Sequence, residues 1–289
     1  MSDNLRGAVF MVLAMATFAL EDMALKAAAQ DIPIGQAVTM LGIAGTLVFI
    51  AMARLQGDRA FHPALLGKVL IIRSGFEVSG RLFYALAIVL TPLSSASAIL
   101  QATPLVVALG AVFVFGETVG WRRWMAILVG LGGVLMILRP GFDDFDPLSI
   151  LAVLGMIGFA GRDLATRASP VTMSSAQLGV AGFIVLTFSG LVLLLVSGEV
   201  AAPTLRSLLL VGLATLVGVI AYNALTISMR VGELSVVAPF RYSRLLFALI
   251  LGVAVFGERP DFWTLLGSAI IVASGLFLLA RGRPAKPSL

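Results

Sequence analysis

Several charged side chains stand inside stretches of this sequence that are otherwise apolar, and their spacing suggests what they bind. Arg73, Glu77 and Arg81 follow one another at intervals of four residues, so a helix would present all three on one face and Glu77 could pair with either arginine. Tyr84 lies three residues beyond Arg81, on nearly the same stripe. Two interpretations stay open: a structural stripe that neutralises itself, or one wall of a polar cavity that water or a solute fills.

Two arginines that follow Pro239 form a second group of cations. Pro239 removes one helical hydrogen bond and can kink a helix at this point. Arg241 and Arg244 are three residues apart, on one helix face, and their own segment offers them no acid. They therefore need carboxylates from elsewhere, either Glu77 or Asp163 or the carboxylate of a substrate, because guanidinium groups match carboxylates well. The pattern favours a cavity lining.

Acidic and basic residues also alternate near the ends of two matching segments. Asp22 lies four residues before Lys26, and Asp163 lies four residues before Arg167, so we expect each pair to be a structural contact within its own helix. Glu21 and its counterpart in the other segment have no such partner and are better candidates for a cavity. Buried amides and phenols serve equally well as bridges between helices or as ligand contacts. The candidate residues for substrate contact are Glu21, Glu77, Arg81, Tyr84, Gln101, Arg162, Tyr222, Asn223, Arg241, Tyr242 and Arg244.

Other kinds of chemistry find little support in the sequence. The chain has no cysteine and a single histidine, His62, which cannot make a usual zinc site, so we expect no metal, no cofactor and no catalytic residues. No basic run of the kind that binds nucleic acid is present. The one cluster of carboxylates, at residues 143–146, is more typical of a solvated turn than of the active site of an integral membrane transferase, which is the alternative from another functional class.

The elements that position these residues are predicted to be apolar helices. Hydrophobic residues make up 60% of the 289 residues and charged residues 12%, with a mean hydropathy of +1.06, whereas soluble domains are about half apolar and a quarter charged. The chain therefore belongs in a bilayer, where a spanning helix needs roughly 20 apolar residues. The sequence predicts ten spans, at residues 7–27, 33–53, 65–89, 92–115, 121–138, 148–168, 174–197, 207–229, 234–256 and 261–280.

The distribution of lysine and arginine predicts which way these spans run. Cytoplasmic ends of membrane helices carry an excess of these residues. With both termini inside, eleven of them fall at cytoplasmic ends and four at outer ends. The eleven are Arg6, Arg54, Arg59, Lys68, Arg122, Arg123, Arg167, Arg230, Arg281, Arg283 and Lys286, and the four are Lys26, Arg139, Arg206 and Arg259. We therefore expect a multi-pass protein of the cell (inner) membrane with cytoplasmic N- and C-termini.

The two halves of the chain repeat each other at one constant offset, which is the step from Glu117 to Glu258. The run that ends in Gly116-Glu117 returns with an end in Gly257-Glu258, and Asp22 matches Asp163 at the same offset. Further matches at this offset are Met15 with Met156, Phe18 with Phe159, Leu93-Ser94 with Leu234-Ser235, and Lys26 with Arg167 in charge. Five spans per copy is an odd number, so the second copy enters the membrane from the opposite side. The fold class predicted is an all-α polytopic membrane protein with two inverted five-helix repeats, 1–141 and 142–289, that together form one transport domain.

The repeat resembles the drug/metabolite transporter superfamily, and within it the ten-helix exporters with two EamA-type repeats. The residues that carry the resemblance are "PLVVALGAVFVFGE" at 104–117 and "PFRYSRLLFALILGVAVFGE" at 239–258, with the segments that follow each. The resemblance covers nearly the whole chain, and among such proteins the chain is most similar to amino-acid exporters, including the aromatic type. The proline-to-glutamate spacing is shorter in the first half, from Pro104 to Glu117, than in the second, from Pro239 to Glu258. We therefore expect the two kinks to lie at different depths. We also expect the Gly-Glu pairs to be structural turns.

The sequence thus favours a secondary transporter that exports amino acids, of broad or aromatic specificity, by alternating access. The resemblance implies the export direction. The substrate's carboxylate would need a cation, which Arg241 or Arg244 could supply, and its ammonium an anion, from Glu77 or Glu21. A drug or other small-metabolite exporter on the same scaffold is the first alternative. The partners expected are an amino-acid substrate and the lipid bilayer, with no nucleic acid, and the protein is expected to be a monomer.

Overall fold

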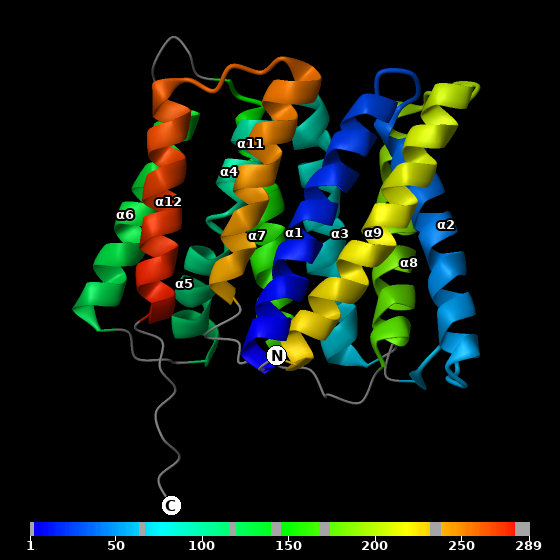
Figure 1. Ribbon diagram of the computed structural model, residues 1–289, viewed down its shortest axis with the longest axis horizontal. Helices are drawn as coiled ribbons and strands as arrows, with labels where there is room; N and C mark the ends of the chain where they lie inside the picture. Colours follow the sequence, from blue (N-terminus) through cyan, green and yellow to red (C-terminus); the bar gives the residue numbers. More distant parts are fainter. Residues whose placement is uncertain are drawn as a thin grey trace, which may run out of the picture.

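Long apolar helices lie side by side in the computed structural model of the chain, which describes residues 3–63, 67–115, 120–139, 146–167, 174–231 and 238–280 (Figure 1). The first half contains α1 (Asp3–Ala28), α2 (Ile34–Leu55), α3 (Lys68–Leu90), α4 (Leu93–Leu100), α5 (Thr103–Phe115) and α6 (Trp121–Leu138). The second contains α7 (Ser149–Arg167), α8 (Ser175–Ser197), α9 (Leu205–Val231), η2 (Ala238–Tyr242), α11 (Ser243–Phe256) and α12 (Phe262–Ala280).

Within the described residues these helices make ten passes, because α4 with α5 and η2 with α11 each form one broken pass. Successive passes run in opposite directions, so that α1 begins and α12 ends on the same side of the bundle (Figure 1). The predicted all-helical fold with ten spans is therefore confirmed. Five passes are long and apolar enough to cross a membrane by length and composition alone: α1, α2, α4 with α5, α8 and α9. Of the remaining passes, α3 and α7 carry the charges that the sequence placed within the membrane.

The helices pack in pairs that join the two halves. The most extensive contacts are those of α1 with α9, α2 with α8, α3 with α7 and α6 with α12. At the offset of the repeat, α1 corresponds to α7 and α3 to α9, so the α1–α9 pair and the α3–α7 pair are images of each other. In Figure 1, α6 with α12 and α2 with α8 lie at opposite ends of the molecule, with the other helices between them. This arrangement is that of an inverted repeat.

Glycine allows the closest of these approaches. In the α3–α7 contact, a Cβ added to Gly158 would lie 2.6 Å from the Cα of Gly80, and in the α6–α12 contact one added to Gly133 would lie 2.8 Å from the carbonyl oxygen of Gly267. Small residues let membrane helices approach until their backbones touch, which increases the dispersion attraction between them. The α3–α7 contact holds α3 and α7 in register, and these two helices carry most of the intramembrane charges.

The two broken passes lie at matching places in the repeat, which corrects the expectation of kinks at different depths. The first break falls at Gln101–Ala102, between α4 and α5, and the repeat counterpart of Gln101 is Tyr242, at the end of η2. Pro104 lies in the first turn of α5, where its missing N–H costs nothing, so the helix ends before the proline rather than bending at it. The breaks correspond although the prolines do not.

Candidate functional site

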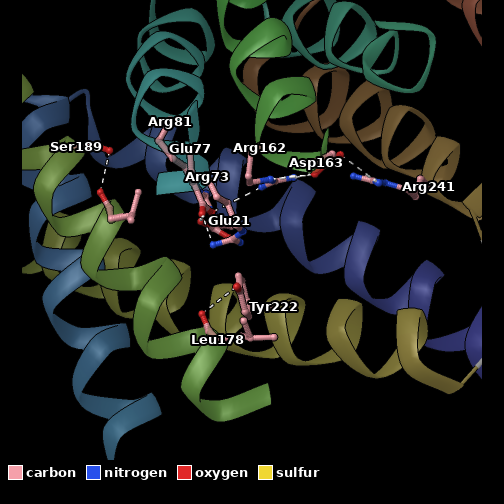
Figure 2. A network of polar contacts seen from close by, with 11 residues as sticks. Glu21, Arg73, Glu77, Arg81, Arg162, Asp163, Leu178, Ser189, Tyr222 and Arg241 are labelled. Carbon is pink, nitrogen blue, oxygen red and sulfur yellow. Dashed lines mark hydrogen bonds and ion pairs between the residues drawn. The ribbon is translucent and has the colours of Figure 1, made fainter. Parts of the chain in front are cut away.

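A chain of ion pairs crosses the middle of the bundle from α3 through α7 to η2 (Figure 2). Glu77 is fully buried and accepts contacts from Arg73 Nη1 at 3.2 Å and Arg162 Nη1 at 3.7 Å. Arg162 also donates to Asp163 Oδ1 from Nε at 3.0 Å and from Nη2 at 2.8 Å. The other oxygen of Asp163 lies 3.7 Å from Arg241 Nη1. Glu77 and Asp163 thus share Arg162 between them, and the chain ends on Arg241.

A second group joins α1 to α3, α4 and α11. Arg244 Nη2 donates to Asp22 Oδ2 at 2.6 Å, and the Tyr84 hydroxyl donates to the same oxygen at 3.2 Å. The Tyr84 hydroxyl also lies 3.3 Å from the Ser97 hydroxyl. The guanidinium of Arg244 stands over Phe18 at 5.2 Å and over Tyr84 at 5.6 Å from the ring centroids. Asp22 and Arg244 are therefore fixed by charge, hydrogen bonds and aromatic stacking together.

Arg81 is held much more loosely than Arg244. Its Nη1 lies 3.8 Å from Glu21 Oε1, beyond hydrogen-bonding distance. Among the described residues its buried Nε has no hydrogen-bond partner, although the guanidinium stands 5.9 Å from the ring centroid of Phe159. The same ring lies 5.0 Å from the guanidinium of Arg162. Phe159 therefore acts as a shared platform for two arginines.

Between these groups lies a cavity of about 80 Å³. Among the described residues its wall holds four arginines and one acid, with aromatic and apolar side chains between them. The lining residues are Met15, Phe18, Asp22, Arg81, Tyr84, Leu100, Gln101, Thr103, Pro104, Phe159, Arg162, Leu225, Arg241 and Arg244. Ligand pockets are typically about 300–1,000 Å³, so the cavity must widen before it can hold a metabolite.

The cavity takes part of its polar wall from the helix breaks. Gln101 and Thr103 flank the break between α4 and α5, and Arg241 and Arg244 flank the junction of η2 with α11. Broken helices at the middle of a bundle expose backbone and polar side chains to a ligand, as the substrate sites of many inverted-repeat transporters do. The two breaks meet at the cavity because the repeat places them at matching depths.

The residues predicted from the sequence divide into two sets. Six line the cavity: Arg81, Tyr84, Gln101, Arg162, Arg241 and Arg244. Five are not among its lining residues: Glu21, Glu77, Tyr222, Asn223 and Tyr242. Tyr222 donates to the carbonyl of Leu178 at 3.0 Å and so joins α9 to α8 (Figure 2). Among the described residues, the buried hydroxyl of Tyr242 has no hydrogen-bond partner.

One of the two predicted pairings is wrong. Lys26 does not pair with Asp22 but with Glu258, and Asp22 pairs with Arg244. Asp163 pairs with Arg162 and Arg241. The second predicted pair, Asp163 with Arg167, remains a prediction, because the side chain of Arg167 lies outside the described residues. Spacing within one helix could not reveal the partners of Lys26 and Asp22, because Glu258 and Arg244 come from another part of the chain. Glu21 and Arg162, which have no partner at that spacing, contact Arg81 in the first case and Glu77 and Asp163 in the second.

Eight lining residues lie outside the predicted set, and three of them contact the arginines of the cavity: Asp22, Phe18 and Phe159. The repeat held the signal, because Phe18 matches Phe159 and Asp22 matches Asp163 at the same offset. Each phenylalanine stacks with a cavity arginine, and each aspartate accepts a contact from an arginine of η2 or α11. Residues that a chain keeps in both of its repeats thus surround the cavity on two sides.

The second Gly-Glu pair fastens one end of the bundle, as a cluster of Lys26, Leu93, Ser94 and Glu258 that we call the Glu258 cluster. Glu258 accepts from the backbone N–H of Leu93 at 2.6 Å, the N–H of Ser94 at 3.0 Å and the Ser94 hydroxyl at 2.8 Å. Lys26 Nζ adds an ion pair at 3.2 Å. An acid thus caps the N-terminus of α4.

The Glu258 cluster confirms that this Gly-Glu pair is a structural turn, since Gly257 adopts φ +64. Its acid caps a helix of the other half rather than the following one. Burial alone would raise the pKa of Glu258, but hydrogen bonds from Ser94 and Leu93 and the charge of Lys26 outweigh it and hold the pKa below its ordinary value. The first pair, Gly116-Glu117, lies outside the described residues.

Ten passes in two inverted repeats, with broken helices around a central charged cavity, define a multi-pass membrane transporter. The chain belongs to the EamA-like transporter family, which is matched over residues 5–139 and again over 147–280. The resemblance seen in the sequence, to the drug/metabolite transporter superfamily with two EamA repeats, is confirmed. The family is one of transporters, so this chain is a transporter and not an enzyme.

Characterised relatives carry different solutes. The chain is 28% identical to an S-adenosylmethionine uptake transporter of Rickettsia bellii over 81% of this chain and 77% of that protein. It is 28% identical to a riboflavin transporter of Rhizobium johnstonii over 81% of this chain and 76% of that protein. It is 26% identical to a pseudopaline exporter of Pseudomonas aeruginosa over 94% of this chain and 95% of that protein.

A crystal structure of another protein has the same fold. It covers 96% of this chain and 98% of its own, with a TM-score of 0.62 at 18% identity. The family and the named relatives together establish transport of a small molecule, with the substrate and the direction of transport differing among the relatives.

Proposed function

We propose that the chain is a secondary transporter that exports amino acids from the cytoplasm by alternating access. The observation that carries the proposal is the cavity wall, to which the described residues contribute four arginines and one acid. An α-carboxylate would bind to Arg81 and Arg241, and the α-ammonium to Asp22. Asp22 takes the role that the sequence gave to Glu77 or Glu21, because among the described residues it is the acid on the wall. Apolar neighbours such as Met15 and Leu225 would tolerate several side chains.

The named relatives are compatible with an amino-acid head group. S-adenosylmethionine carries a free α-amino and α-carboxyl group, so the uptake transporter of Rickettsia bellii binds a solute of this kind. Export is supported by the pseudopaline exporter, which matches the chain over almost its full length. Transport of a neutral metabolite is the second candidate, favoured by the riboflavin transporter. A lipophilic cation is disfavoured, because four guanidinium groups face the cavity.

The cycle we propose moves the two repeats, 1–141 and 142–289, against each other around the cavity. The Glu258 cluster closes the bundle at one end, and the cavity extends from Asp22 past Met15 toward the end where α1 begins. If the protein lies in the inner membrane with both termini in the cytoplasm, as we propose, that end faces the cytoplasm. The protein would work as a monomer, because the cavity is built from both halves of one chain.

Flux into and out of proteoliposomes tests the proposal, with Arg241→Ala as the main variant. Removal of the Arg241 side chain should leave the fold intact, because Asp163 keeps the hydrogen bonds from Arg162 at 2.8 and 3.0 Å. A lost hydrogen bond between charged groups costs about 1.5–3 kcal/mol, so we expect amino-acid flux to fall roughly ten- to hundredfold. Arg206→Ala is the matched control, since Arg206 is an exposed arginine paired with Asp31. Equal flux in Arg241→Ala and wild type would remove the site assignment.

A further inference from the structure

In the part of the chain that the structure describes, the charges in the middle of the bundle do not balance. Their cations and anions contact one another in the two groups described above, and each lies within a membrane pass. Among the described residues the cations are Arg73, Arg81, Arg162, Arg241 and Arg244, and the anions are Glu21, Asp22, Glu77 and Asp163. These five cations and four anions, which we call the central cluster, have a net charge of +1. Lys26 and Glu258 form a separate, neutral pair at the end of the bundle.

The excess charge lies at the cavity, on its two loosely held arginines. Arg241 lies 3.7 Å from Asp163 and Arg81 lies 3.8 Å from Glu21, and neither distance is a hydrogen bond. Arg244 is held at 2.6 Å by Asp22, and Arg162 at 2.8 Å by Asp163. Arg81 and Arg241 both line the cavity. They can therefore turn toward a bound anion while Arg162 and Arg244 keep the acids of the site paired.

A charge without a counter-charge is costly in a low-dielectric interior. A zwitterionic solute would leave the central cluster with its single positive charge, and a cationic solute would double it. A solute with a net charge of −1 would cancel it. We infer that the preferred substrates carry one more carboxylate than ammonium group, as acidic amino acids do. This inference rests on the proposed function and narrows it, because neutral and aromatic amino acids become weaker substrates.

Matched solutes that differ in net charge test the inference in proteoliposomes of the full chain at pH 7. One pair is glutamate and glutamine, which are nearly equal in size but carry charges of −1 and 0. A second set is N-acetylphenylalanine, phenylalanine and phenylalanine amide, with charges of −1, 0 and +1. We expect the anionic member of each set to be transported with a kcat/KM at least tenfold above that of the zwitterion.

Variants then connect this preference to the two arginines. Arg241→Gln and Arg81→Gln each lower the cluster charge from +1 to 0, so each should bring the glutamate-to-glutamine ratio to one or below. Either variant suffices if the other fails to fold. Arg206→Gln, which removes an exposed cation far from the cluster, should keep the wild-type ratio.

The outcomes separate this inference from the proposed function. Zwitterions transported as well as anions, or a ratio unchanged in both variants, would overturn the charge inference and leave amino-acid transport standing. Flux of the N-acetylated acid and of lactate without flux of any free amino acid would support the charge inference and overturn amino-acid transport. Absence of flux for every solute would overturn both.

Discussion

Replacing Glu258 by glutamine should loosen the end of the bundle that this residue fastens. The carboxylate accepts three hydrogen bonds from Leu93 and Ser94, at 2.6–3.0 Å, and one ion pair from Lys26. A glutamine side chain keeps one oxygen that can accept a hydrogen bond, but its NH₂ group would face the remaining donors and cannot accept from them. Hydrogen bonds to charged groups contribute about 1.5–3 kcal/mol each, and one acceptor remains, so we expect a loss of about 2–4 kcal/mol. At about 2 °C per kcal/mol for a chain of this length, the Tm falls by roughly 4–8 °C.

The pH dependence of the same difference provides an independent check. The folded pKa of Glu258 lies below its ordinary value of 4.5. Its contribution to stability is therefore complete above about pH 4.5 and is lost as the pH falls through the lower, folded pKa. The difference in Tm between wild type and Glu258→Gln should stay constant from pH 7 to pH 5 and shrink below pH 4.5. Purified protein in detergent, followed by intrinsic fluorescence on heating, gives both quantities.

A glycine variant tests the cluster without changing any charge. A Cβ added to Gly252 would lie 2.5 Å from Glu258 Oε2, so Gly252→Ala should push the carboxylate away from Ser94 and reproduce part of the loss. Gly212→Ala, on α9 where a Cβ meets no atom within 4 Å, is the control and should keep or slightly raise the Tm. A Tm for Glu258→Gln within 1 °C of wild type, or a difference that does not respond to acid, would refute this account of the Glu258 cluster.

Two further predictions concern the core of the site. Gly158→Ala should prevent the close approach of α7 to α3, because the new Cβ would lie 2.6 Å from the Cα of Gly80 and backbone atoms cannot move aside easily. Size-exclusion chromatography should show loss of folded protein. The control Gly132→Ala, whose Cβ would meet no atom within 4 Å, should behave as wild type. Arg244→Ala should destabilise the protein more than Arg241→Ala, because it removes the 2.6 Å ion pair of buried Asp22. Breaking a buried ion pair costs about 3–5 kcal/mol. Equal Tm values for the two variants would contradict the division into tightly and loosely held arginines.

The architecture was predictable because it depends on patterns that sequence displays directly. Apolar runs of about 20 residues mark spans, and matches such as Asp22 with Asp163 at one constant offset mark the inverted repeat. The presence of charge in α3 and near Arg241 was predictable too, because a guanidinium inside an apolar run needs a partner or a cavity.

Some partners of these charges were predictable, namely an arginine four residues away for Glu77 and Asp163 for Arg241. Others were not, because they come from neighbouring helices. Lys26 has Asp22 four residues before it, yet it lies at the level where Glu258 arrives from α11 and takes the contact. Arg244 reaches Asp22 because α11 packs on α1, which no spacing within either helix could reveal. The break at Gln101 was also unforeseen, since Pro104 marks the start of the next helix rather than the kink itself.

Counterflow of a labelled amino acid tests the central claim most directly. Proteoliposomes loaded with excess unlabelled glutamate are diluted into a trace of labelled glutamate. An alternating-access transporter for amino acids exchanges one for the other, so the label should accumulate inside transiently above its outside concentration, and Arg241→Ala should accumulate much less. A label that only equilibrates, or that enters wild-type and protein-free vesicles equally, would contradict amino-acid transport by alternating access.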